Sequence, residues 1–515
     1  MRKRFIAPFF LLSITLVAFF LRYYGLKNNN PFWVDEFATA AQAKLFMHYG
    51  LGVFTNPNIF FEPHNITTHI IVALFFKVLG FHEYAARLPF VIIGSFVTLF
   101  IFLVAKQMYG NRTAVISALL STFSYIEITW SRQARDYVLI QLLILLLLYL
   151  YNKMLLKNKL NIWERFIFFA TIVAGVLSHA LFLLFLITLI LHWFYRERKI
   201  LKTPLFYVLS LVVIIIIFRT GLLLAVINSF KGGLIKANNL WYYHSFLWRE
   251  YGLITFLALV GLLMALKTNF KLTLFPLVYI FFNLIFISFF FAPYTSRYLL
   301  PIFPFLFIFM AYAISYLTDI FCRIKKISYP TIIAILLTLF IIGSGYKFVN
   351  KPKSFYSVNH DFREIALVDY QQIYDIMKTA VANSKTPVAI IETWPARVYW
   401  YFGLDYQPTY FFHWINEPGT VNGLGKQTNF VVDKNGDKII PRTNHLVLVG
   451  NLTDFKKVMQ KYSKGFIFID DASLPADVIS YANSHLKKQL YLDHYPLDDN
   501  PYSIWPATLY SWGFK

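Results

Sequence analysis

The sequence predicts a polytopic α-helical membrane protein that carries a C-terminal α/β domain. Three observations lead to this fold class. Of the 515 residues, 58% are hydrophobic and only 14% are charged, which is unlike an ordinary soluble protein. Apolar runs of the kind that cross a bilayer recur as far as about residue 346. Beyond that point, short β-type runs alternate with helical ones.

The charge and the cysteine count exclude two other classes. The formal net charge of +22 is compatible with nucleic-acid binding. However, the Lys and Arg residues stand in short clusters between apolar runs, as the positive-inside rule expects, so no nucleic-acid partner is predicted. Cys322 is the only cysteine, which excludes an intrachain disulfide and a cysteine metal cluster.

The basic loops also predict the membrane topology. The run 70–80 is shorter than the roughly 17–25 apolar residues of a span, and we expect it to lie flat in the interface. Every strongly basic loop then lies in the cytoplasm, with the N-terminus inside and the C-terminal part outside. The first run follows Arg2-Lys3-Arg4 and is interpreted as a retained span. The about eleven expected spans are 5–21, 88–105, 113–129, 138–152, 166–176, 181–194, 205–227, 253–265, 272–291, 298–318 and 331–345.

This topology predicts two domains. Residues 1–346 form the transmembrane domain, with a long first external loop at 25–88, and residues 347–515 form an extracytoplasmic α/β domain. The expected strands of the second domain are 387–391, 445–450 and 465–470, and its expected helices are 457–462 and 476–487. An aromatic run at 394–402 could stack on a sugar, although packing against the membrane domain is the simpler interpretation.

The pair Asp35 and Glu36 follows the first span. Two carboxylates at the edge of the hydrocarbon are costly, which indicates a function. The alternative is that they begin a short interfacial helix, whose N-terminus carboxylates complement. With the predicted topology, the other unusual polar residues gather on the same outer face. They are Glu62, His64, Arg87, Arg132, Arg135, Asp136, His179 and Arg297.

A cluster of carboxylates and arginines suits a substrate that carries phosphate. Arginine forks bind phosphate oxygens bidentately, and a carboxylate can deprotonate an incoming hydroxyl. Simpler roles stay open. Arg87 could anchor a helix, Arg132 and Arg135 could snorkel to the interface, and His179 could be a polar turn residue. Glu62 and His64 are candidate metal ligands, but they do not make a specific signature.

The order of these motifs resembles the membrane glycosyltransferases of the GT-C fold. Within that fold it resembles the group of protein O-mannosyltransferases and lipid A aminoarabinose transferases. The likeness extends over residues 5–346. The motifs that carry it are Trp33-Val34-Asp35-Glu36, Phe61-Glu62-Pro63-His64-Asn65, the Gly and Arg-Leu-Pro of 80–89, Ser131-Arg132-Gln133-Ala134-Arg135-Asp136-Tyr137, and Ser296-Arg297-Tyr298-Leu299-Leu300-Pro301.

The resemblance implies an inverting enzyme. It would move a sugar from a dolichyl- or undecaprenyl-phosphate carrier to a hydroxyl of a protein, lipid or cell-envelope glycan on the outer face of the membrane. Asp35 would be the general base, with Glu36 as support. The donor phosphate would meet Arg297, Arg132, Arg135 and Arg87.

The resemblance also bears on cofactors and on the acceptor. Asp136 would be a partner in the site or a ligand of a divalent cation, whereas no nucleotide or organic cofactor is expected. Relatives have Lys or His where this chain has Glu62, which argues against lipid A as the acceptor.

Two interpretations from other classes stay open. A transporter or flippase of lipid-linked substrates would also keep charges near the membrane, but it would place them at the midplane and often show internal repeats. A membrane scaffold without catalysis would have no need of Asp35.

Overall fold

The structure, a computed structural model, consists of two compact units. The first comprises residues 1–24, 90–132 and 136–352, and the second 25–89, 133–135 and 353–515, so the division falls within helix α4 (Glu83–Tyr109). The described residues are 2–29, 31–54, 65–157, 160–196, 237–291, 294–354, 356, 368–403, 406, 408–413, 415–416, 420–422, 427–440, 446–470, 474–493 and 507–514.

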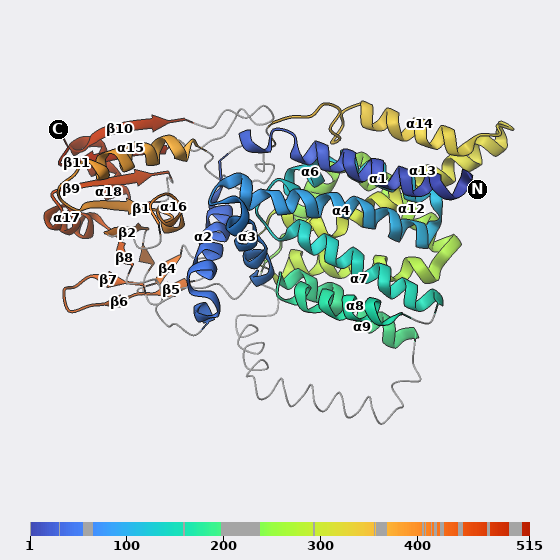
Figure 1. Cartoon of the computed structure of the whole chain (residues 1–515), viewed down its shortest axis with the longest axis horizontal. Helices are drawn as coiled ribbons and strands as arrows, with labels where there is room; N and C mark the ends of the chain where they lie inside the picture. Colours follow the sequence, from blue (N-terminus) through green and yellow to red (C-terminus); the bar gives the residue numbers. More distant parts are fainter. Residues whose placement is uncertain are drawn as a thin grey trace, which may run out of the picture. The chain divides into compact units, whose positions relative to one another are not determined.

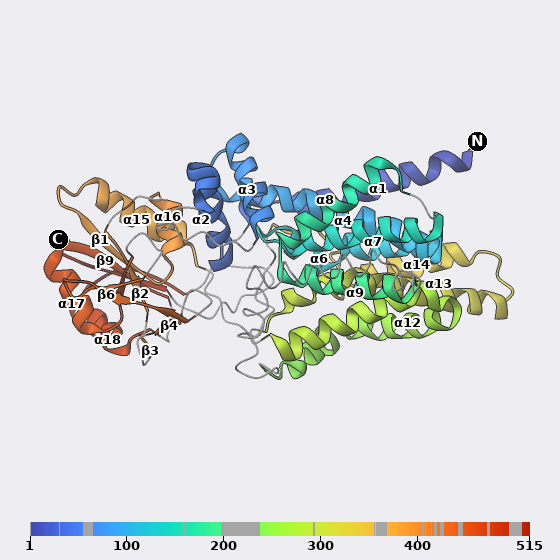
Figure 2. The same ribbon diagram turned by 90° about the horizontal axis from the view of Figure 1, so that it is seen from below.

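The first unit is a bundle of apolar helices that run side by side (Figure 1, Figure 2). Its helices are α1 (Arg2–Tyr23), α5 (Asn111–Phe123), α6 (Tyr125–Ser131), α7 (Tyr137–Lys157), α8 (Ile162–Val176), α9 (Ala180–Arg196), α12 (Leu240–Ile285), η4 (Phe286–Phe290), η5 (Ser296–Ile302), α13 (Phe303–Ile324) and α14 (Pro330–Gly343).

Five helical stretches of the described residues are long and apolar enough to cross a membrane. They are Phe9–Asn28, Glu83–Tyr109, Tyr137–Leu156, Leu240–Phe290 and Ser296–Ile324. The predicted span 205–227 lies outside the described residues, so the number of eleven spans stays a prediction.

The expected span 113–129 is interrupted in the structure. Ser124 leaves helical geometry and caps α6, since its hydroxyl accepts a hydrogen bond from the Glu127 N–H at 3.5 Å. The chain here pairs with residues 347–349, because the Val349 N–H donates to the Phe123 carbonyl at 2.7 Å. Partners more than 200 residues away therefore end α5 where its composition would allow it to continue.

Helix α12 covers two of the expected spans. Tyr251 and Asn269 have non-helical backbone angles, so the element is divided into three helical stretches. The turn that the sequence predicts between residues 265 and 272 is found as the break in helical geometry at Asn269. The amide of Asn269 donates to the Met108 carbonyl at 3.2 Å.

The second unit joins residues 25–89 to a sheet domain. Its helical elements before the sheet are η1 (Leu26–Asn28), α2 (Val34–Tyr49), η2 (Gly50–Phe54) and α3 (Ile66–Leu79). Helices α2 and α3 pack together, and α2 packs on α16 (Pro395–Tyr401) of the sheet domain. Because α16 covers residues 395–401, the aromatic run 394–402 is largely helical.

The sheet has the strand order β10-β11-β9-β1-β2-β8-β7-β6. The central strands β9, β1, β2 and β8 are parallel, and their neighbours are antiparallel. The bounds are β1 (Val388–Glu392), β2 (Thr409–Phe412), β6 (Val431–Val432), β7 (Lys438–Ile439), β8 (Val447–Val449), β9 (Lys464–Ile469), β10 (Lys487–Leu492) and β11 (Ala507–Trp512). A small antiparallel sheet holds β3 (Ile415–Asn416), β4 (Thr420–Asn422) and β5 (Gln427–Asn429).

Helices cover both faces of the larger sheet (Figure 2). Residues of one parity, such as Ala389 and Ile391, face the core beneath α17 (Leu452–Lys461) and α18 (Ala476–His485). Residues of the other parity face α15 (Tyr370–Ala382), where Tyr370 packs edge-on against Phe468. Because successive strand residues point to opposite faces, short buried runs supply both layers.

The three strands that the sequence predicts are confirmed as β1, β8 and β9. Both predicted helices have different bounds. Helix α17 begins at Leu452, because the Asn451 side chain caps it through the Asp454 N–H. Helix α18 ends at His485, because the edge strand β10 begins at Lys487.

Candidate active site

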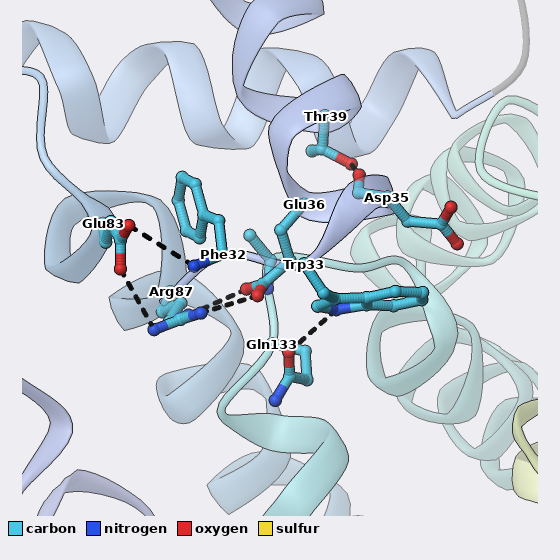
Figure 3. A network of polar contacts seen from close by, with 9 residues as sticks. Phe32, Trp33, Asp35, Glu36, Thr39, Glu83, Arg87 and Gln133 are labelled. Atoms are coloured by element: carbon cyan, nitrogen blue, oxygen red, sulfur yellow. Dashed lines mark hydrogen bonds and ion pairs between the residues drawn. The ribbon is translucent and has the colours of Figure 1, made fainter. Parts of the chain in front are cut away.

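Asp35 and Glu36 lie in the first turn of α2. Carboxylates in this position complement the exposed N–H groups of a helix end, so the simpler interpretation of the pair describes its local structure correctly. Adjacent helix residues project about 100° apart, however, so the two side chains meet different surroundings. Figure 3 shows Asp35 turned away from the contacts of Glu36.

Glu36 is held by a buried ion pair. Its carboxylate accepts hydrogen bonds from Arg87 Nε at 2.8 Å and from Arg87 Nη2 at 2.6 Å (Figure 3). The backbone N–H of Ala134 donates to the same carboxylate at 2.8 Å. Both side chains of the pair are buried. A bidentate, fully hydrogen-bonded pair of this kind is the arrangement in which burial of charge is tolerated.

Glu83 extends this pair into a network. It lies one helical turn before Arg87 in α4, at 3.6 Å from the guanidinium, and accepts a hydrogen bond from the Phe32 N–H at 3.3 Å. Gly80, with φ of +90°, ends α3 and lets α4 begin three residues later. The network therefore fixes the entry to α2 and the start of α4 together.

Asp35 has a more open setting. Its side chain is 27% exposed, against 0% for Glu36. Arg135 Nη2 lies 3.5 Å from its carboxylate, and Arg135 Nη1 donates to the Asp35 carbonyl at 3.2 Å and to the Thr39 hydroxyl at 3.0 Å. A carboxylate that is reachable and oriented by one guanidinium can accept a proton from a bound hydroxyl.

Trp33 precedes α2 and takes part in the same arrangement. Its indole N–H donates to the Gln133 side chain at 3.0 Å (Figure 3). The loop 133–135 therefore contacts Trp33 through Gln133, Glu36 through the Ala134 N–H, and Asp35 through Arg135. Of the predicted residues, the second unit thus brings together Asp35, Glu36, Arg87 and Arg135.

The first unit holds four more of the predicted residues, and three of them gather near Tyr137. Asp136 immediately precedes Tyr137 and is buried at the start of α7. The Arg297 guanidinium lies 5.7 Å from the ring centres of Tyr137 and Tyr298. The His179 ring centre lies 5.5 Å from that of Tyr137. Arg297 is nearly buried, in a cation–π setting.

Arg132 and His179 also have clear structural roles. Arg132 Nη1 donates to the carbonyls of Arg22 and Tyr24 at 2.8 and 2.6 Å, so it satisfies acceptors at the C-terminal end of α1. Nδ1 of His179 accepts a hydrogen bond from the Leu181 N–H at 3.0 Å, at the start of α9. Glu62 and His64 lie outside the described residues.

Sequence reasoning did not select Thr39, Glu83, Gln133 or Ala134. Glu83 and Arg87 have the i, i+4 spacing of a helical ion pair, which is the one local signal for this set. Gln133 and Ala134 lie about 100 residues from their partners Trp33 and Glu36, and Ala134 acts through its backbone. No local pattern encodes such contacts.

Comparison with known proteins matches residues 63–223 to the family described as dolichyl-phosphate-mannose-protein mannosyltransferase. Among solved structures, the chain is similar to ArnT from Cupriavidus metallidurans bound to undecaprenyl phosphate. The TM-score is 0.59, with 10% identity over 97% of both chains. The chain has the GT-C fold.

The same fold occurs in the archaeal oligosaccharyltransferase AglB from Archaeoglobus fulgidus, in complex with an inhibitory peptide and a dolichol-phosphate. The TM-score is 0.50, with 12% identity over 78% of this chain and 64% of that one. No curated protein sequence matches. With its apolar helices, the GT-C fold makes the chain a multi-pass membrane protein, as the sequence predicts.

A divalent cation was left open by the sequence. One structure of the Archaeoglobus enzyme is a complex with Zn and sulfate. In this chain, no three His, Cys, Asp or Glu side chains within the described ranges are grouped as metal ligands. The candidate ligands Glu62 and His64 lie outside those ranges, so the divalent cation stays a prediction.

Proposed function

We propose that the protein is an inverting glycosyltransferase. It moves a sugar from a polyprenyl-phosphate carrier to a hydroxyl of an acceptor on the outer face of the membrane. The family match and the GT-C fold support this class, since the proteins matched are named as a mannosyltransferase family, ArnT and an oligosaccharyltransferase. They give no support to the flippase alternative.

The observation that carries the proposal is the different setting of Asp35 and Glu36. The Glu36 carboxylate is enclosed by Arg87 and the Ala134 N–H, whereas the Asp35 carboxylate is partly exposed and contacted by Arg135. Asp35 is therefore the general base, and Glu36 positions it by fixing the first turn of α2 to α4. In this role Arg87 is a positioning residue rather than a phosphate ligand.

Single displacement needs little else from the protein. As Asp35 takes the acceptor proton, the hydroxyl oxygen forms a bond to the anomeric carbon and the bond to the carrier phosphate breaks. The departing phosphate leaves without a general acid when positive charge is supplied to it. From the motif resemblance we assign this task to Arg297, whose guanidinium lies 5.7 Å from two tyrosine ring centres and keeps its charge at any working pH.

The experiment that tests this function is a transfer assay with the purified full chain in lipid. A panel of dolichyl- and undecaprenyl-phosphate sugars is supplied with cell-envelope extract, and release of the free lipid phosphate is followed. We expect release with at least one donor, and a large loss of that release in Arg297→Gln. If no donor releases phosphate while labelled donor crosses the bilayer, the flippase interpretation replaces this proposal.

A further inference from the structure

The second unit contains a polar pocket, separate from the surroundings of Asp35, of about 350 Å³. It is lined by the turn before α4, the start of α15 and the end of α16. Its volume lies within the range of small-molecule sites, roughly 300–1,000 Å³. We propose that this pocket binds a sugar ring of the acceptor.

One wall of the pocket is aromatic and firmly held. Trp400 packs its ring 5.2 Å from that of Phe32 and 5.8 Å from that of Phe76, measured between ring centres. Tyr401 stacks on Tyr374 at 4.1 Å. Rigid aromatic faces bind the apolar face of a pyranose at little cost in conformational entropy.

The rest of the lining is suited to hydroxyl groups. Asn29 and Gln371 contribute amides, of which Gln371 Nε2 already donates to Asp375 at 2.7 Å, and Glu83 and Asp369 contribute carboxylates. A few placed polar groups beside an aromatic wall are the usual composition of a site that orients a small polar ligand. Lys378 is the one lysine among the described lining residues, and its ammonium lies 5.3 Å from the Tyr401 ring centre.

The charges of the pocket oppose a phosphate ligand. Two carboxylates against one lysine leave the lining without the excess of positive charge that binds phosphate. The donor carries its phosphate next to the sugar, so the donor is the poorer occupant. An uncharged glycan fits best. That this glycan belongs to the acceptor rests on the proposed transferase activity.

The pocket and the base are joined by a chain of contacts. Glu83 lines the pocket and also lies 3.6 Å from Arg87, which in turn binds Glu36 beside Asp35. Glu83 is therefore common to the pocket lining and to the network that holds the first turn of α2.

The test measures binding without any donor, so its result does not depend on transfer. The full chain in lipid nanodiscs is titrated with mannobiose, cellobiose, lactose, chitobiose and a Ser/Thr-rich peptide, followed by saturation-transfer NMR. Gln371→Ala removes one lining amide. Gln372→Ala is the matched control, because Gln372 is the exposed neighbour in α15 and does not line the pocket.

We expect at least one disaccharide to bind, with about fivefold weaker affinity in Gln371→Ala, as for the loss of one hydrogen bond, and unchanged affinity in Gln372→Ala. Trp400→Phe keeps an aromatic ring in the wall but a smaller one, so it should weaken binding of the same disaccharide. Three results would overturn the proposal: no disaccharide binds, Gln371→Ala and Trp400→Phe both bind like the wild type, or only the peptide responds to these substitutions. If sugars bind while no donor is ever used, the pocket stands and the transferase function fails.

Discussion

At the scale of single residues, two neighbouring carboxylates lie in different surroundings and have different roles. Glu36 is buried in a bidentate pair, and Asp35 is reachable from solvent. The sequence allows the prediction that the pair matters, because charge beside hydrocarbon is costly. It does not reveal the division of roles, since Ala134 acts through a backbone N–H from a distant loop.

Glu36→Gln should therefore lower the stability of the folded protein. The substitution leaves the buried Arg87 guanidinium with Glu83 as its remaining carboxylate, at 3.6 Å. Breaking one side of a buried pair costs about 3 kcal/mol or more. We expect a clearly lower melting temperature of the purified protein. A melting temperature equal to that of the wild type would show that the pair does not hold α2 to α4.

At the scale of elements, the end of strand β1 carries a second buried ionic cluster. Arg397 of α16 binds Glu392 at 2.6 Å and Asp470, which follows β9, at 2.7 Å. The carboxylate of Asp470 also accepts a hydrogen bond from the Thr393 hydroxyl at 2.7 Å. Two carboxylates share one guanidinium, so one of them is poorly compensated.

Burial raises the pKa of Glu392 to about 7, although Arg397 opposes the shift. The folded state then holds a proton that the unfolded chain loses near pH 4.5, so this group contributes stability at low pH that is lost as the pH rises to about 7. Glu392→Gln keeps the uncharged form. Relative to the wild type, its melting temperature should rise between pH 5 and pH 8. A constant difference in melting temperature between Glu392→Gln and the wild type from pH 5 to pH 8 would contradict the raised pKa of Glu392.

The contact of α12 with α13 depends on a glycine. A Cβ atom at Gly261 would lie 1.8 Å from the Phe309 carbonyl oxygen, so the two helices approach through the missing side chain. Gly261→Ala should destabilise the bundle by about 1–3 kcal/mol. Gly343→Ala is the control, because no atom lies within 4 Å of its added Cβ. Equal melting temperatures of the two variants would refute the close approach.

At the scale of the whole molecule, composition and apolar runs were enough to predict a polytopic helical membrane protein, because the bilayer leaves helices as the way to satisfy the backbone. The GT-C fold was predicted from the order of the motifs, through their resemblance to a known group of enzymes. Contacts between distant residues were beyond such reasoning. Residues 25–89 belong to one unit with residues 353–515 because α2 packs on α16, more than 300 residues later. The predicted domain boundary at residue 346 took no account of that contact.

The topology of the chain stays a prediction that labelling can test. In a Cys322→Ala background, Lys434→Cys places a thiol on the exposed β6–β7 turn, and Lys325→Cys places one after α13. With the sheet domain outside, an impermeant maleimide should label position 434 in intact cells and position 325 only after permeabilisation. The reverse pattern would invert the assignment.

The most direct test of the account is the rate of lipid-phosphate release by Asp35→Asn, measured with the donor that the wild type uses. Asparagine keeps the size of the side chain and removes the base, so we predict a loss of about 10²- to 10⁴-fold with an unchanged melting temperature. Asp437→Asn, in the β6–β7 turn and outside the pocket lining, is the control and should release phosphate at the wild-type rate. Release at the wild-type rate by Asp35→Asn would contradict its role as the general base.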